Sequence, residues 1–267
     1  MDWSRAKTYL ILTFLLLDIV LGYQYWQART EQASYVQSFA EQLAEVRELL
    51  ASQKWELRTE VPKTTPELGF LQVRYLPLPP DEWAKRIGGG KLLHQGPGQV
   101  TVDLSEKHIA VNLEEDNPGD KALAQIGAKL SPKETYQYDR KLQESKDSGI
   151  IQYLQMYNNY PIFSAPLELV VQGGKLIRYQ QTALNVVGEG GGRKQVISAL
   201  HALRSLSESI DKSGKRADNR VIREIRLGYY SKPFNADEWY LIPMWRILSD
   251  REVYYVNALT GEVELAR

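Results

Sequence analysis

The segment with the strongest likeness to a ligand-binding loop is Gly188–Lys194, which reads GEGGGRK. Glycine-rich loops that lead into a helix bind phosphate groups through their backbone N–H groups. A P-loop needs Gly-Lys-Ser/Thr after a four-residue gap, but Arg193, Lys194 and Gln195 follow the glycines here. A dinucleotide-binding loop needs a glycine at the position of Arg193. We therefore interpret this segment as a flexible connection.

Residue types that commonly carry out catalysis are scarce. Cysteine is absent, and the three histidines, His94, His108 and His201, lie far apart. These facts exclude disulfides, iron–sulfur clusters, cysteine nucleophiles and most zinc sites. A Ser-His-Asp triad stays open because its members are distant in sequence, although no nucleophile-elbow or metalloprotease motif is present. The acidic cluster at 114–120 lacks the EF-hand spacing. We predict no catalytic residue, no cofactor and no metal.

Charge and composition narrow the class of protein further. The 267 residues include 33 basic and 33 acidic side chains, and 43% of the residues are hydrophobic. A net charge of zero argues against binding to nucleic acid or another polyanion. The apolar and charged fractions are those of a folded protein with one or two domains.

The apolar residues are concentrated in one segment near the N-terminus, Thr8–Trp26. As a helix these residues measure roughly 28 Å, which is close to the thickness of a bilayer core. Aromatic residues flank the segment, and Arg5 and Lys7 precede it, which favours a cytoplasmic N-terminus. A cleaved signal peptide is the alternative, but no small-x-small pattern follows the apolar run. The sequence predicts a single-pass protein of the cell membrane, with most of the chain extracellular.

Asp18 lies near the middle of this expected span. An acidic residue there costs about 2.5–3.5 kcal/mol on insertion, which the apolar neighbours offset. The helix either tolerates this charge or uses it to contact another transmembrane helix, and we favour the contact because intramembrane ionisable groups usually face a protein partner. Thr13, Leu17 and Leu21 complete the expected contact face.

The opening sequence MDWSRAKTYLILTFLLLDIVLGYQYW resembles the N-terminus of the YycI family. The resemblance rests on the Asp-Trp start, Arg-x-Lys-Thr, the long apolar run, the central Leu-Asp and the aromatic residues that follow. It implies a non-enzymatic regulator that acts with a YycH-like partner on a WalK-like sensor histidine kinase of the WalKR (YycGF) system, which controls cell-wall metabolism. The specific part of the resemblance covers about the first 26 residues.

A second helix is expected directly after the span, within residues 27–54, which lack Gly and Pro. Its apolar residues recur at alternating intervals of three and four, which forms a seam over two heptads. The seam either packs on the first outer domain of the chain or pairs with a partner. It consists of Val36, Phe39, Leu43, Val46 and Leu50.

The remaining chain predicts an α+β fold with two small β-rich modules. We expect a cytoplasmic tip at 1–7, the span at 8–26, the juxtamembrane helix at 27–54, a first domain at 55–147 and a second at 148–267. Alternating apolar residues predict strands throughout both domains, with a hairpin formed by Gln99–Leu104 and Lys107–Leu113. Apolar positions between Arg193 and Ile210 predict a helix. The C-terminal strands resemble the terminal hairpin of PepSY-like domains. The two modules as a whole are expected to have a PepSY-like or YycH-like fold.

Two other classes of function stay open at this point. One is a membrane-anchored hydrolase or transferase that acts on envelope polymers, which requires a pocket with a histidine or a carboxylate pair and convergent polar groups. The other is a PepSY-like protease inhibitor. We also expect association with other chains, as a hetero-oligomer or homo-oligomer.

Overall fold

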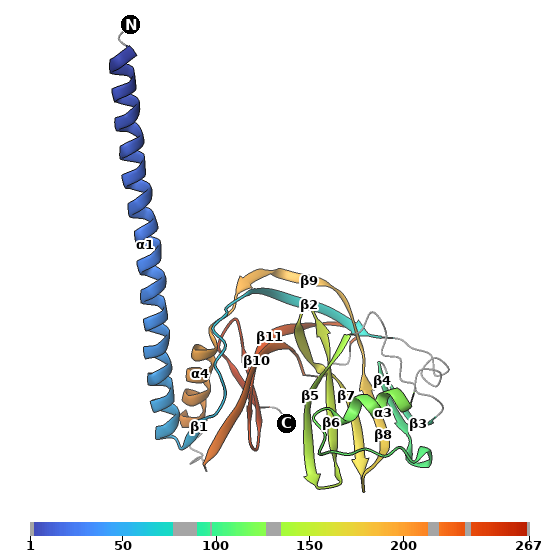
Figure 1. The fold of residues 1–267 in the computed structure, drawn as a ribbon. Helices are drawn as coiled ribbons and strands as arrows, with labels where there is room; N and C mark the ends of the chain where they lie inside the picture. Colours follow the sequence, from blue (N-terminus) through green and yellow to red (C-terminus); the bar gives the residue numbers. More distant parts are fainter. Residues whose placement is uncertain are drawn as a thin grey trace.

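The computed structural model describes residues 3–76, 90–96, 98–126, 135–212, 219–232 and 236–265. Figure 1 shows a long helix standing beside a body composed mainly of strands. The fold is a mixed α+β fold with most of its regular structure in β-sheet, which confirms the expected class.

The long helix α1 (Trp3–Ser52) is continuous over 50 residues, so it is roughly 75 Å long. The expected span and juxtamembrane helix are therefore one rod, whose N-terminal half extends beyond the body (Figure 1). The helix ends before Lys54, which takes a left-handed φ of 64° in the turn that follows. Within the part of the chain that the structure describes, no helix has an apolar stretch long enough to cross a membrane.

The larger hydrophobic core, core 1, lies between helices and a sheet. The last turns of α1 and all of α4 (Ala199–Lys212) cover one face of this sheet, with buried Leu50 and Leu203 among the core residues. Strands β10 and β11 are antiparallel, and β1 adds to β10 in parallel. The strands are β1 (Trp55–Leu57), β10 (Arg220–Tyr230), β11 (Glu238–Ser249), β12 (Val253–Asn257) and β13 (Val263–Leu265).

A second core, core 2, lies between a helix and the neighbouring part of the sheet. The strand order there is β5-β6-β7-β8-β4-β3, and α3 (Pro118–Gln125) packs beside these strands (Figure 1). Gly173 and Gly174 have positive φ in the turn between β7 and β8, as a two-residue hairpin turn requires. The strands are β3 (Lys91–Gly96), β4 (Gln99–Asp103), β5 (Thr135–Ser145), β6 (Ser148–Tyr157), β7 (Tyr160–Gln172) and β8 (Lys175–Thr182).

The predicted hairpin of Gln99–Leu104 with Lys107–Leu113 is wrong. The first strand forms as β4, but it pairs with β3 and β8. Asp103 accepts hydrogen bonds from the backbone N and the Oγ of Ser105 at 2.9 and 2.7 Å, which starts a short 3₁₀ helix, η1 (Ser105–Lys107). This local turn replaces a hairpin ladder because a short polar side chain competes for the backbone donors.

The prediction that GEGGGRK is a flexible connection is also wrong. Its residues belong to β9 (Leu184–Gln195), which pairs with β2 (Glu67–Tyr75), and β2 pairs in turn with β11. The two strands form an arch over both cores (Figure 1). Gly191 and Gly192 have positive φ at a register shift, so the glycines form a bulge in β9, and the expected helix at 193–210 begins only at Ala199.

The expected domain boundary between residues 147 and 148 falls in a turn. Strands β5 and β6 pair on either side of it, with Ser145 opposite Ser148. Core 2 draws its buried residues from both sides of this position, between Val100 and Ala183. The two cores therefore do not divide the chain there.

The two cores meet where β10 crosses β7, and a glycine makes this approach close. Tyr229 pairs with Ile162 there. A Cβ on Gly228 would lie 2.5 Å from the carbonyl oxygen of Pro161 and 2.7 Å from the ring of Phe163. Only a residue without a side chain fits between these groups.

Replacing Gly228 by alanine is therefore expected to lower the free energy of unfolding by about 1–3 kcal/mol, because the backbone of β7 must shift. Gly188→Ala in β9 is the matched control, since nothing lies within 4 Å of the position that its Cβ would take and its φ is not positive. Urea unfolding followed by tryptophan fluorescence measures both variants. Equal stability of the two would show that β10 and β7 tolerate a wider separation.

Candidate functional site

The base of α1 is joined to core 1 by the predicted apolar seam. Val46 and Leu50 have no exposed surface, and Phe39 and Leu43 are partly buried against the same core. The side chain of Val36 lies outside the described residues. The four described members pack within the chain, in a core shared with α4 of the expected second domain and with β1 of the expected first.

Polar contacts reinforce this attachment of α1 to α4. Glu45 and Arg204 form an ion pair with an N–O distance of 2.5 Å, and Nε2 of Gln53 donates to the carbonyl oxygen of Ser207 at 3.1 Å. The ion pair is exposed and contributes little, whereas the buried apolar residues supply most of the free energy. The end of α1 is thus a fixed part of the outer fold.

The other end of α1 has the opposite character. Its described large apolar side chains, from Leu10 to Tyr23, are all exposed. Thr13, Leu17, Asp18 and Leu21, the expected contact face, are exposed too, so the assignment of this face to a partner stays a prediction.

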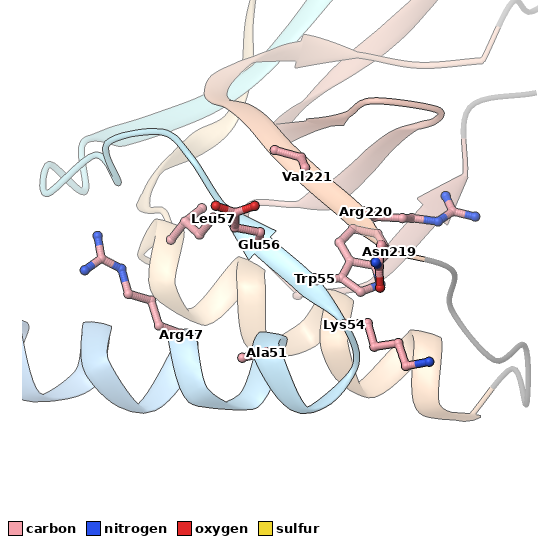
Figure 2. A pocket seen from close by; sticks show the side chains of 9 residues that line it. All are labelled: Arg47, Ala51, Lys54, Trp55, Glu56, Leu57, Asn219, Arg220 and Val221. Carbon is pink, nitrogen blue, oxygen red and sulfur yellow. The ribbon is translucent and has the colours of Figure 1, made fainter.

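A groove borders α1 where the helix turns into β1. It encloses about 440 Å³ and is lined by side chains from α1, β1 and the start of β10 (Figure 2). We call it the β1 groove; its residues are Arg47, Ala51, Lys54, Trp55, Glu56, Leu57, Asn219, Arg220 and Val221. Because these residues come from both the rod and the outer fold, an occupant of the groove would contact both.

A second site joins the two cores through buried charges. The side chain of Asp139 on β5 has no exposed surface, and that of Arg246 on β11 is only 2% exposed. The Nη1 and Nη2 atoms of Arg246 donate to Oδ2 and Oδ1 of Asp139 at 2.9 and 2.5 Å. The same guanidinium donates to Oε1 of Glu224 on β10, and it lies over the ring of Phe163, 4.6 Å from the ring centre.

A bulge in β5 explains why Asp139 reaches this position. The register of β5 against β6 shifts between Tyr138 and Arg140, so Asp139 is the extra residue. A bulge redirects a side chain away from the regular alternation. Two further cations surround the carboxylate, with Arg226 Nη1 at 3.3 Å and Arg140 Nε at 3.7 Å. We call Asp139, Arg140, Glu224, Arg226 and Arg246 the arginine–carboxylate cluster.

The electrostatics of this cluster keep its central arginine charged. Burial acts to lower the pKa of Arg246, but the hydrogen bonds and charges of Asp139 and Glu224 outweigh it and raise the pKa overall. Burial, followed by the charge of Arg246, lowers the pKa of Arg140. The cluster holds β5 of core 2 to β10 and β11 of core 1.

A third feature bears on catalysis. A hollow of about 200 Å³ on β3, β4, β7 and β8 includes His94 and Glu168 in its lining. This volume is below the roughly 300–1,000 Å³ typical of ligand sites. Glu168 accepts a hydrogen bond from Gln152 at 2.9 Å, and within the described ranges no hydrogen bond joins His94 to a carboxylate. The pairing that orients a histidine base is therefore not formed among these residues.

Sequence reasoning found the apolar seam but missed the β1 groove and the arginine–carboxylate cluster. One signal for the cluster was present: Arg246 interrupts the apolar run WRIL of β11 at a position between two buried residues, Trp245 and Ile247. A buried arginine requires an acidic partner. The identity of that partner depends on the bulge at Asp139, which alternation does not predict.

The family model described as "YycI protein" matches residues 22–259. No curated protein matches the chain. An uncharacterized protein from Eubacterium rectale ATCC 33656 is similar in structure, with a TM-score of 0.47 and 10% identity over 80% of this chain and 91% of that one. The C-terminal domain of Bacillus megaterium YpeB has a TM-score of 0.36 and 16% identity, over 64% of this chain and 72% of that one.

Proposed function

This chain belongs to the YycI family, and from that premise we propose that it modulates a WalK-like sensor histidine kinase that controls cell-wall metabolism, together with a YycH-like partner. The family is a regulatory one, of the WalKR two-component system. In this proposal the chain itself catalyses no reaction. Its effect on the kinase arises from binding one kinase state more tightly than the other.

The observation that carries the proposal is the continuity of α1. One helix begins in an apolar segment and ends with Val46 and Leu50 fully buried in core 1. A continuous helix attached in this way transmits a displacement of the outer fold along its axis. Regulation of a kinase through its transmembrane helices requires such a mechanical connection.

We further propose that Thr8–Trp26 spans the cell membrane, with the N-terminus in the cytoplasm and the outer fold on the extracellular side. The exposed apolar side chains support this, because the consecutive residues Leu15, Leu16 and Leu17, which point in different directions around α1, are 54%, 65% and 48% exposed. Exposed apolar surface of this extent is typical of a membrane or partner contact. Arg5 and Lys7 support the orientation.

A chimera tests this mechanism. Thr8–Trp26 is replaced by an unrelated span of the same 19 residues in length, so that the outer fold keeps its distance from the membrane. The readout is kinase-dependent transcription in cells that lack the native chain. We expect modulation of the kinase to be lost while the chimera still inserts. Full modulation by the chimera would contradict a contact through the span.

A narrower prediction concerns Asp18. Replacing it by leucine is expected to weaken copurification with the kinase or the YycH-like partner about fivefold, because one polar contact between transmembrane helices contributes about 1 kcal/mol. Ile19→Ala, on the other side of the helix, is the control and keeps normal recovery. Membrane fractionation checks that both variants insert. Unchanged recovery of Asp18→Leu would mean that the helix merely tolerates the charge.

A further inference from the structure

The outer edge of β1 borders the β1 groove. Arg220 N donates to the carbonyl oxygen of Lys54 at 3.1 Å, and Arg58 N donates to that of Ile222 at 3.0 Å. In a ladder, alternate residues face the neighbouring strand. The backbone groups of Trp55 and Leu57 therefore face away from β10, and among the described residues no strand pairs with that edge of β1.

The basic and acidic side chains at the groove do not balance one another. Glu56 is paired with Arg58 at 2.8 Å, and Arg220 is paired with Glu252. Arg47 on α1 and Lys54 in the following turn have no acidic partner among the described residues. Figure 2 shows these two cationic side chains at opposite ends of the groove. The unbalanced charge of the groove is therefore positive.

The lining between the two cations is small or apolar. Ala51 on α1 leaves room beside the strand, and Leu57 and Val221 add aliphatic surface. A strand edge beside a helix, with apolar lining, is the arrangement in which extended peptides add to a sheet. Backbone hydrogen bonds then provide the affinity, and the flanking side chains provide selectivity.

We propose that the β1 groove binds an extended acidic segment of another protein, which adds to β1 as a further strand. Its backbone bonds to Trp55 and Leu57, and its carboxylates pair with Arg47 and Lys54. The site goes beyond the proposed kinase regulation and does not depend on it, since peptide binding to the groove requires neither a kinase nor a membrane span. An occupant would contact α1 and core 1 at once.

The test uses the full chain in detergent micelles and a blocked hexapeptide of alternating glutamate and valine, measured by isothermal titration calorimetry. We expect binding, and we expect the double variant Arg47→Glu with Lys54→Glu to weaken it at least about tenfold, because two charge-assisted contacts are reversed. Lys175→Glu, an exposed charge reversal at the far hairpin of core 2, is the matched control and leaves binding unchanged. A lysine–valine peptide is expected not to bind.

A second measurement separates strand addition from simple charge attraction. The same acidic peptide with alternate backbone amides methylated retains its charges but loses its donors on one edge. We expect the pattern that methylates the amides facing β1 to weaken binding and the other pattern to retain it. We also expect Leu57→Pro in the protein to reduce binding of the unmodified peptide, because it removes one donor of the free edge. Full binding of both methylated peptides would overturn the proposal, and so would no binding of the acidic peptide.

Discussion

Replacing Asp139 by alanine is expected to destabilise the outer fold by about 3–5 kcal/mol. The variant leaves Arg246, which is 2% exposed, with Glu224 as its remaining carboxylate partner. It also leaves Arg226, Arg140 and Arg246 close to one another without the carboxylate that offsets the repulsion between their charges. The penalty comes chiefly from a buried cation that has lost one of its two carboxylate partners, and only in small part from the loss of one attractive contact.

The free energy of unfolding in urea measures this effect, and an exposed ion pair provides the control. Lys121 and Glu115 lie 2.9 Å apart with 73% and 38% of their side-chain surfaces exposed. Lys121→Ala is expected to cost less than about 1 kcal/mol, because solvent screens such pairs. If Asp139→Ala lowers the free energy of unfolding by no more than this control does, the cluster is not a buried, tightly coupled group of charges.

A double variant distinguishes a buried charge from a packing defect. Asp139→Leu combined with Arg246→Met replaces the central ion pair with apolar groups of similar size. Such replacements are often neutral or stabilising. We expect the double variant to recover much of the stability that Asp139→Leu alone loses. A cycle with the single variants Asp139→Leu and Arg246→Met should give a coupling energy well above the roughly 0.5 kcal/mol error of additivity. Separate, additive losses would assign the effect to packing alone.

The sequence predicted the elements whose pattern is local. Strands such as β4 and the second half of β7 alternate between buried and more exposed residues, and α4 has a regular apolar face. The seam on α1 was found for the same reason, because its buried residues recur at helical spacing. Local periodicity was sufficient to predict an element wherever one face of that element packs on a single core.

Features that depend on pairing between distant segments were not predictable in this way. The glycines of β9 have the composition of a loop, but their role is to bulge against Gly69, whose Cβ would lie 3.0 Å from the carbonyl oxygen of Gly190. The turn at Asp103 likewise replaced an expected hairpin through side-chain hydrogen bonds. The arginine–carboxylate cluster combines β5, β10 and β11, and the position of Asp139 in it depends on a bulge whose location only the partner strand β6 defines.

Replacing Leu50 by alanine is expected to lower the free energy of unfolding by about 2–5 kcal/mol, the range for a leucine that leaves a cavity in a packed core. Leu50 has no exposed surface and lies in core 1 at the contact of α1 with α4. Its neighbour Leu49 is 37% exposed, so Leu49→Ala is the matched control and should cost less than about 1 kcal/mol. Urea unfolding of the two variants makes the comparison.

The same substitution tests whether α1 couples the outer fold to the kinase. A loosened base lets α1 move independently of core 1, so Leu50→Ala should reduce modulation of kinase-dependent transcription at temperatures where the protein remains folded and inserted. Leu50→Met, which keeps the volume and costs less than about 1.5 kcal/mol, should restore both stability and modulation. Full modulation by a folded Leu50→Ala variant would mean that the rod acts without a rigid attachment to core 1, and the contact of α1 with α4 would then serve folding alone.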